Sequence, residues 1–370
     1  MKATKVIKCK IVGLTKCKRA SIEKEYRAVQ DALQLEKEGL DFLPMYDNLP
    51  IHSHMKADSL KNYNRLCKKE QPISIRKGSF KIERRNNKLA KYWLRIPCFD
   101  YIKMRGYQNS SKKKLWVAIK PHMDIPDDVT FAESKIIKKG TDFYFHLTIQ
   151  KDIVLKTSYS SVLGVDLGIR RIASVCDLCN GHTRFYGKKL RAVRGKYFYL
   201  RKKLGEKKLL KVIKRIGNKE KLISNHLLHE ISRDIVENAK KTNSAIIIGK
   251  LKGIRKQKHG KGRKFGRKLN SFPFYKLTNM IKYKALWEGI MTTEVSEAWT
   301  SQTCSQCGER GTRTQGLFKC SCGYEDNSDR NGAINIAKRG LGYISKSGVD
   351  TELPIISEMN LECATEKIRC

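Results

Sequence analysis

Four cysteines in the last quarter of the chain constrain its folding more than any other feature. They form two close pairs, Cys304 with Cys307 and Cys320 with Cys322, and the segment between the pairs is polar and contains glycine. Four thiolates spaced in this way can hold one Zn²⁺ in tetrahedral coordination. The alternative is a set of unligated core cysteines, but so polar a segment could not fold alone without a metal to hold it. The pattern therefore predicts a zinc knuckle whose second pair, separated by one residue, makes the tighter turn.

The charge balance points to a polyanionic partner. The 370 residues include 77 Lys and Arg against 36 Asp and Glu, a formal net charge of +41. Self-repulsion of this size opposes a compact fold unless a polyanion neutralises it, so we expect nucleic acid to be the partner. No apolar run approaches the ~20 residues of a membrane span and no signal peptide is found, so we expect a cytoplasmic, nucleoid-associated protein without membrane contact.

The other cysteines are expected to be structural. In a reducing compartment, 12 cysteines favour metal ligation by the clustered ones over a disulfide framework. Cys9, Cys67 and Cys98 are scattered, and we expect them to be small buried apolar residues. Cys176 and Cys179 form another close pair, but no second pair lies nearby, so we interpret this one as a chance spacing rather than a metal site.

The N-terminal half alternates between helical and strand patterns. A strand is predicted at 4–13, a helix at 21–38 with Ser21 as its N-cap, and a further helix at 58–69. Short alternating strands punctuated by Gly, Asn and Pro follow from 73 to 156. These patterns predict a small antiparallel barrel or sandwich with a helical insertion near its start.

The second half has the pattern of an α/β domain. A buried strand at 162–168 carries Asp166 near its end, and a basic helical region follows from 188 to 241. The apolar run 245–248 fits a buried parallel strand, and the basic, glycine-containing stretch 250–268 is predicted to be a loop. A helix at 274–289 and a strand at 291–299 then lead to the cysteines.

Two aspartates are candidates for a metal-dependent active site. Asp166 lies at a strand end, where an aspartate is most often a turn former, and Asp329 lies at a helix start, where it is most often an N-cap. Two-metal phosphoryl chemistry, however, needs carboxylates from separate elements that converge on ions ~3.5–4 Å apart. Spacing along the chain leaves that convergence open.

Several ordered motifs resemble the TnpB family, transposon-encoded proteins related to the type V CRISPR effectors. The motifs are Gly164-Val165-Asp166-Leu167-Gly168, the run from Thr300 to Gly308, Cys322-Gly323-Tyr324 and the run from Asp329 to Ile336. The resemblance is strong over about 158–341, and the N-terminal half matches only in outline. It implies an RNA-guided DNA endonuclease of a transposable element, with a guide RNA from its own locus, a DNA target, structural Zn²⁺ and catalytic Mg²⁺. It also implies that Asp166 is the first metal-binding acid and Asp329 the last.

The fold class predicted from pattern and resemblance is α/β plus all-β, with an RNase H-like (RuvC-like) nuclease domain interrupted by a zinc ribbon. The predicted parts are a wedge-like β-barrel domain at 1–157 with a helical insertion at about 21–70, a first nuclease part at 158–299, the zinc ribbon at 300–323, a last nuclease part at 324–345 and a tail at 346–370.

One departure from the family pattern puts catalysis in question. The family usually carries a glutamate at the end of the middle strand, where this chain has Gly249, which cannot bind a metal. Either activity is lost, leaving a nuclease-inactive RNA-guided DNA-binding protein that acts like a repressor, or another glutamate occupies the same space. Glu294 and Glu297 lie on the next predicted strand, and alternation lets only one face the metals. Glu297 is the better candidate because it lies nearer the edge where strand ends gather, although it could also be an ordinary solvated residue.

Two basic regions are predicted to contact nucleic acid. They lie near Lys188, Arg201 and Lys208 and near Arg255 and Arg263. The plain alternative is a solvated helix face, but like charges at helical spacing repel each other unless phosphates lie alongside. A further alternative, a zinc-ribbon DNA-binding protein acting without RNA, would require tight specific DNA binding by the RNA-free chain.

Overall fold

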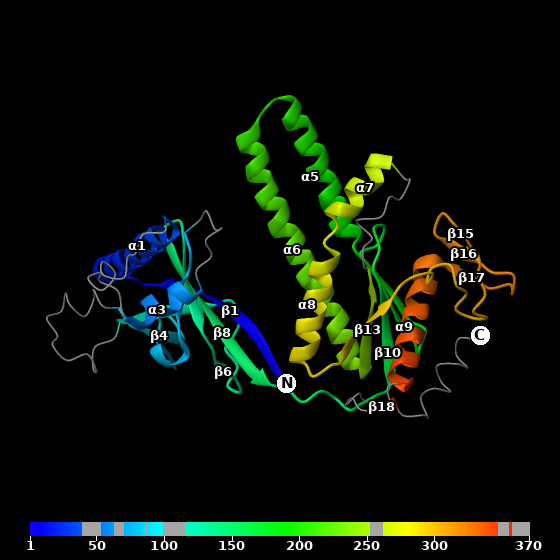
Figure 1. Ribbon diagram of the computed structural model, residues 1–370, viewed down its shortest axis with the longest axis horizontal. Coiled ribbons are helices and arrows are strands. Elements are labelled where there is room, and N and C mark those ends of the chain that lie inside the picture. The colour runs from blue at the N-terminus through cyan, green and yellow to red at the C-terminus, as the bar shows by residue number, and fades with distance from the viewer. Residues whose placement is uncertain are drawn as a thin grey trace. The chain divides into compact units, whose positions relative to one another are not determined.

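The structure is a computed structural model that describes residues 1–38, 53–62, 70–85, 87–98, 115–251, 262–346 and 355–356 (Figure 1). The chain divides into two compact units, one of residues 2–152 and one of Met1 with residues 153–370. Among the described helices, none is long and apolar enough to cross a membrane.

An antiparallel sheet is the framework of the N-terminal unit. Its strands follow the order β2-β7-β8-β1-β5-β4-β3, with β6 paired to β8. Among the described residues this path begins at β2 and ends at β3, so the pairings give an open half-barrel where the sequence predicted a barrel or sandwich. The strands are β1 (Lys2–Val12), β2 (Ile73–Ile75), β3 (Lys81–Arg84), β4 (Tyr92–Ile96), β5 (Leu115–Pro121), β6 (Thr130–Phe131), β7 (Ser134–Lys139) and β8 (Asp142–Asp152).

One face of this sheet is apolar because buried and solvated residues alternate along β1 and β8. Helix α1 (Lys16–Glu38) packs on that face, where Tyr26 meets the edge of Phe143 with ring centroids 5.9 Å apart. Helix α3 (Ser53–Lys61) and the 3₁₀ helix η1 (Lys77–Ser79) lie between β1 and β3 in the chain. The predicted helix at 58–69 overlaps α3, and its residues from 63 onward lie outside the described part of the chain.

A mixed five-stranded sheet organises the second unit. Its order is β12-β11-β10-β13-β14; β10 is antiparallel to β11 and parallel to β13, and β13 is parallel to β14. The strands are β10 (Ser161–Asp166), β11 (Ala173–Asp177), β12 (Thr183–Tyr186), β13 (Ser244–Lys250) and β14 (Thr292–Ser296), and β9 (Ser158–Tyr159) pairs separately with β18 (Ile355–Ile356). Every residue of β13 except the last, Lys250, is buried, because helices cover both faces of the sheet.

Helices form a layer on each face of this sheet. On one face, α5 (Lys188–Glu206), α6 (Leu210–Lys241), α7 (Gly262–Ser271) and α8 (Phe274–Trp287) bury their apolar side chains with those of the strands. On the other face, α9 (Ser328–Lys346) packs against Val162, Ile247 and Val295. Figure 1 shows α5 and α6 as a long antiparallel hairpin, and α9 beside β10.

Gly164 allows α9 to lie directly on β10. A Cβ atom at this position would lie 2.1 Å from the backbone oxygen of Ala333, which is far inside van der Waals contact. The helix can therefore approach only a glycine here. Because Asp166 ends β10 and Asp329 opens α9, this close approach brings the two predicted acids to the same end of the domain.

Two predictions about elements need correction. The strand predicted at 291–299 ends at Ser296, and Glu297 to Thr303 form a turn instead. The stretch 250–268 was predicted to be a loop, but its last residues begin helix α7 at Gly262, whose phenylalanine and leucine pack into the core. Residues 252–261, including Arg255, lie outside the described residues, and so does nearly all of the predicted tail.

Candidate metal and catalytic sites

The four predicted zinc ligands converge. Their Sγ atoms all lie within 4.8 Å of one another, with 3.8 Å between those of Cys304 and Cys322 and 3.5 Å between those of Cys307 and Cys320. A tetrahedron of thiolates about 2.3 Å from a zinc ion has edges of about 3.8 Å, so the four residues fit a Zn²⁺ ion. A hydrogen bond with the backbone of Cys322 lowers the pKa of Cys320 to about 7, which favours the thiolate form.

A small three-stranded sheet and two asparagines fix the knuckle to α9. The sheet joins β15 (Thr312–Thr314), β16 (Leu317–Lys319) and β17 (Glu325–Asn327). The buried amide of Asn331 donates to the oxygen of Thr303 at 2.7 Å, and the amide of Asn335 donates to the oxygens of Thr300 and Thr303 at 2.8 and 2.7 Å. The zinc knuckle is thus attached to the helix that carries Asp329.

Asp166 is a half-buried residue at the end of β10. Burial, with the negative charge of Asp329 as the second cause, raises the pKa of Asp166 to about 7, although Arg313 acts in the opposite direction. Gly332 leaves room for this carboxylate, because a Cβ there would lie 2.9 Å from Asp166 Oδ2 and 3.9 Å from the Cα of Ser301. The Asp166 carboxylate therefore lies against α9 at Gly332, which the turn after Glu297 also approaches.

Asp329 lies in the first turn of α9, but its carboxylate does not cap that helix. The side chain of Asn327 accepts hydrogen bonds from the backbone N–H of Asp329 at 3.0 Å and of Arg330 at 3.4 Å. Asp329 Oδ1 instead accepts a hydrogen bond from Arg313 at 3.1 Å, and Arg171 lies 4.0 Å from Oδ2. Two arginines therefore contact the Asp329 side chain, which is 16% exposed and lies near the surface of the site.

Glu297 occupies the space that the side chain of residue 249 would otherwise fill. A Cβ on Gly249 would lie 2.6 Å from Glu297 Oε2. Burial, with the charge of Asp166 second, raises the pKa of Glu297 to about 8. Its Oε2 is buried and has no hydrogen-bond partner among the described residues. Glu294, the other candidate, forms an ion pair with Lys282 of α8 at 2.9 Å.

The three carboxylates are therefore neighbours through Asp166, which is coupled electrostatically to both Glu297 and Asp329. Within the described part of the chain they do not form a cluster as tight as that of the four thiols. The buried Oε2 of Glu297, which has no partner among the described residues, and the mutual repulsion between neighbouring acids are features that a divalent cation would relieve, and carboxylates are ligands that Mg²⁺ prefers. The donor set thus fits a hard divalent cation.

Sequence reasoning missed the two arginines and the glycine at this site. Arg313 comes from β15 of the zinc knuckle, and Arg171 precedes β11 with its guanidinium 3.5 Å from the ring centroid of Phe185. Gly332, in the motif that begins with Asp329, offered a signal, because a glycine inside a helix marks a close approach. The arginines offered none, since both reach Asp329 only through the folded arrangement.

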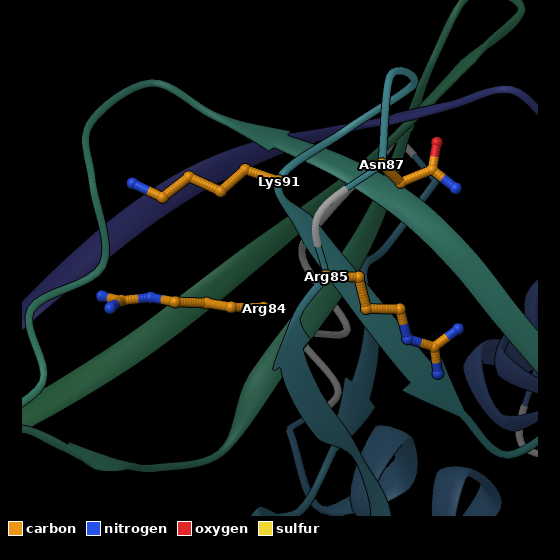
Figure 2. Close-up of a pocket in the computed structure, with 4 residues that line it drawn as sticks. All are labelled: Arg84, Arg85, Asn87 and Lys91. Atoms are coloured by element: carbon orange, nitrogen blue, oxygen red, sulfur yellow. The ribbon is translucent and has the colours of Figure 1, made fainter.

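The predicted basic positions that the structure describes lie on or between helices of the second unit, and a separate polar pocket lies in the N-terminal unit. Along α5, Arg201 pairs with the nearly buried Glu220 of α6, and Lys208 lies in the turn between these helices with φ 52°. Lys188 begins α5, and Arg263 lies in the first turn of α7. With a volume of about 490 Å³, the pocket in the N-terminal unit is lined by Arg84, Arg85, Asn87 and Lys91 (Figure 2).

Figure 2 shows that Arg84 and Lys91 extend to the same side while Arg85 points away from them. Each of the three cations already has a carboxylate partner: Asp127 at 2.8 Å from Arg84, Asp124 at 3.2 Å from Lys91, and Glu83 at 2.9 Å from Arg85. The charges lining this pocket are compensated, so the pocket itself does not define an anion site.

The chain is similar in sequence and in fold to several known proteins. The family model described as Cas12f1-like, TNB domain matches residues 274–336, the segment that holds α8, β14, the four cysteines and Asp329. The chain is 30% identical over 240 residues to the CRISPR-associated endodeoxyribonuclease Cas12f2 of Micrarchaeota archaeon (strain CG1_02_47_40), a match covering 58% of this chain and 44% of that protein. The match thus spans less than half the length of this relative.

Two further comparisons extend this result. The TnpB-like protein aq_aa05 of Aquifex aeolicus (strain VF5) is 29% identical over 248 residues, which cover 58% of this chain and 79% of that protein. The cryo-EM structure of the Cas12f1-sgRNA-target DNA complex superposes with a TM-score of 0.57 at 16% identity, covering 87% of this chain and 81% of that one, which shows a shared fold. The resemblance to the TnpB family that the motifs predicted is confirmed.

Proposed function

We propose that this protein is an RNA-guided DNA endonuclease of a transposable element, with a RuvC-like active site formed by Asp166, Glu297 and Asp329. The relatives named as endodeoxyribonucleases support nuclease chemistry. Strand β10, which ends at Asp166, lies in the middle of the five-stranded sheet. It is antiparallel to β11 on one side and parallel to β13 on the other, and this order supports an RNase H-like fold for the second unit. The open sheet of the N-terminal unit would be the wedge-like domain.

The observation that carries the proposal is the position of Glu297. Its carboxylate fills the space in front of Gly249, and the charge of Asp166 acts on it, so Glu297 would supply the acid that the family usually carries on β13. The glutamate comes from the turn after β14 instead of the end of β13. Gly249 is consistent with this exchange, because a side chain there would clash with Glu297 Oε2.

Asp166, Glu297 and Asp329 would hold Mg²⁺. Bound there, Mg²⁺ supplies water activation and charge stabilisation for phosphodiester hydrolysis. The chain's own contribution is positional: Gly164 and Gly332 let α9 approach β10, and Asn331 and Asn335 hold the turn after Glu297 on α9. The raised pKa values of Asp166 and Glu297 mean that the metal-free site holds protons near neutral pH, which metal binding would displace.

The cationic surface would contact the guide RNA and the target DNA. The net charge of +41 and the long α5–α6 hairpin support binding to nucleic-acid backbones, which proteins recognise through charge and duplex shape. The structural neighbour is a complex of Cas12f1 with an sgRNA and target DNA, which supports the same two classes of partner for this chain. We expect the guide to come from the protein's own locus and the complex to associate with the nucleoid.

A nuclease-inactive, RNA-guided DNA-binding protein is the second candidate. Gly249 favours it, since the usual metal-binding glutamate is absent from β13. Arg313 favours it as well, because its hydrogen bond to Asp329 occupies an acid that a metal would use.

Cleavage of a plasmid target separates the two candidates. The protein is co-purified with RNA from its locus and assayed with Mg²⁺, with Asp166→Ala and Glu297→Gln alongside. If the protein is a nuclease, the wild type should cut the target, and both variants should bind the target without cutting it. Target binding without cutting by the wild type would establish the inactive form. As a readout independent of cutting, Ca²⁺ should raise the melting temperature of the wild type more than that of Glu297→Gln.

A further inference from the structure

Trp299 is held in a conformation that its side chain disfavours. It lies in the turn after Glu297 with φ 66°, in the left-handed region that a bulky residue rarely adopts. Its backbone oxygen accepts hydrogen bonds from the N–H groups of Gln302 and Thr303, both at 2.9 Å. The turn itself therefore imposes this conformation, and a glycine would adopt it at lower cost.

The left-handed conformation does not bury the side chain of Trp299. Trp299 is 55% exposed, so much of its ring surface remains in water. The guanidinium of Arg310, from the zinc knuckle, lies 4.5 Å from the ring centroid. A strained, exposed tryptophan stacked with an arginine contributes little to a core, and such outliers concentrate at functional sites.

The position of Trp299 relative to the acids is fixed. The N–H and the hydroxyl of Thr300 donate to the oxygen of Glu297 at 3.2 and 2.9 Å, and the buried Asn335 holds the oxygen of Thr300 at 2.8 Å. Ser301 and Asp166 both lie within 4 Å of the Cβ position on Gly332. The exposed ring thus belongs to the same rigid turn that carries Glu297 and borders Asp166.

We propose that Trp299 and Arg310 form a stacking site for one base of single-stranded DNA beside the carboxylates. Proteins bind single strands without sequence preference by stacking bases on aromatic rings, with arginine adding cation–π attraction. A base held on this turn keeps the neighbouring phosphodiester next to Glu297 and Asp166. Trp299 is then a positioning residue, and the inference rests on the proposed nuclease function.

The test measures binding without cleavage. Full-length protein with its zinc retained and no added Mg²⁺ is titrated with an oligodeoxythymidylate of about six nucleotides at moderate salt, so that stacking is not hidden by electrostatic binding. Tryptophan fluorescence reports stacking, and the anisotropy of a labelled oligomer reports affinity. Trp299→Phe should lose most of the fluorescence quenching and keep its affinity within about three-fold, and Trp299→Ala should bind about ten-fold more weakly. Tyr275→Ala, which removes an aromatic that is 77% exposed on α8, should bind like the wild type.

Full quenching in Trp299→Phe, or wild-type affinity in Trp299→Ala, would overturn the stacking site. A structural role for the ring is tested with Trp299→Gly, which relieves the left-handed strain. If the ring serves stacking, the melting temperature of Trp299→Gly should equal or exceed that of the wild type. A clearly lower melting temperature would show that the ring stabilises the fold and would contradict the proposal. Because no step here depends on cutting, failure of the stacking site and failure of the nuclease in the plasmid assay are distinguishable.

Discussion

Arg313 of the zinc knuckle donates a hydrogen bond to Asp329 Oδ1 at 3.1 Å, so the zinc module contacts a carboxylate of the proposed nuclease site. The same arginine lowers the pKa of Asp166, against the effect of burial. The charge of Arg313 therefore acts on two of the three acids proposed to hold Mg²⁺. This contact links the two halves of the site, because the cysteines position the strand that carries the arginine.

Removing this arginine should strengthen metal binding. Without its charge, Arg313→Ala should bind Mn²⁺ or Ca²⁺ several-fold more tightly, because the cation no longer competes for Asp329. Calorimetric titration or the metal-dependent rise in melting temperature measures this change. Lys319→Ala is the control. It removes an exposed cation of the neighbouring strand β16, which forms an ion pair with Glu325. Unchanged or weaker metal binding by Arg313→Ala would show that the arginine does not compete with the cation.

The purified protein should contain one zinc per chain. Replacing Cys307 and Cys320 with serine should abolish zinc binding, because each of the two cysteine pairs then loses one thiolate. Elemental analysis measures the zinc, and Cys179→Ser, which lies outside the cluster, should retain it. Zinc well below one per chain in the wild type, or zinc retained by the double variant, would contradict the assignment.

Gly164 should be essential for packing. A methyl group there would overlap the backbone oxygen of Ala333, so Gly164→Ala should lower the free energy of unfolding by about 3 kcal/mol or more. Gly195→Ala is the matched control, because a Cβ at that position in α5 meets no atom of the described residues within 4 Å. It should raise the free energy of unfolding by about 0.5–1 kcal/mol through higher helix propensity. Urea unfolding compares the two, and equal effects would place α9 farther from β10.

Stability without divalent ions should fall as the pH rises. Asp166 with a pKa of about 7 and Glu297 with a pKa of about 8 keep protons in the native state that the unfolded chain has released above about pH 5. The native state thus binds more protons, and each carboxyl that remains protonated lowers the free energy of unfolding by about 1.4 kcal/mol per pH unit.

The decline should extend from about pH 5 to pH 8 and then level off. Urea unfolding of the zinc-loaded protein at several pH values measures it, and the double variant Asp166→Asn with Glu297→Gln should show a shallower slope. A slope identical in the two proteins would mean that these carboxyls are ionised in the native state.

Local patterns in the sequence predicted much of this site. The spacing of the cysteines predicted the cluster of four thiols, because short turns leave four thiols few other arrangements. The apolar run of β13 and the acid at the end of β10 follow from the same local information. A helix start was predicted at Asp329, and α9 begins one residue earlier, at Ser328. The residue that caps it is Asn327, which leaves Asp329 available for other contacts.

The remaining features depend on contacts between distant segments. Glu297 faces Asp166 only because β14 ends at Ser296 and the chain then turns, whereas the alternation pattern extended the strand to Trp299. Arg313 reaches Asp329 across the zinc knuckle, and no periodicity encodes that contact. Helix α7 was missed because charge and glycine dominate its sequence, while Leu269 and Phe265 hold it against the core.

Moving the glutamate from position 297 to position 249 tests whether Glu297 replaces the acid that is missing at position 249. Mg²⁺-dependent target cleavage by the RNA-bound protein is measured for the wild type, Glu297→Ala, Gly249→Glu and the double variant. We expect cleavage by the wild type and none by Glu297→Ala. We also expect impaired cleavage by Gly249→Glu, whose new side chain clashes with Glu297, and partial recovery in the double variant, where the flexible end of Ile336 must move. Undiminished cleavage by Glu297→Ala would contradict the account, and so would target binding without cleavage by the wild type.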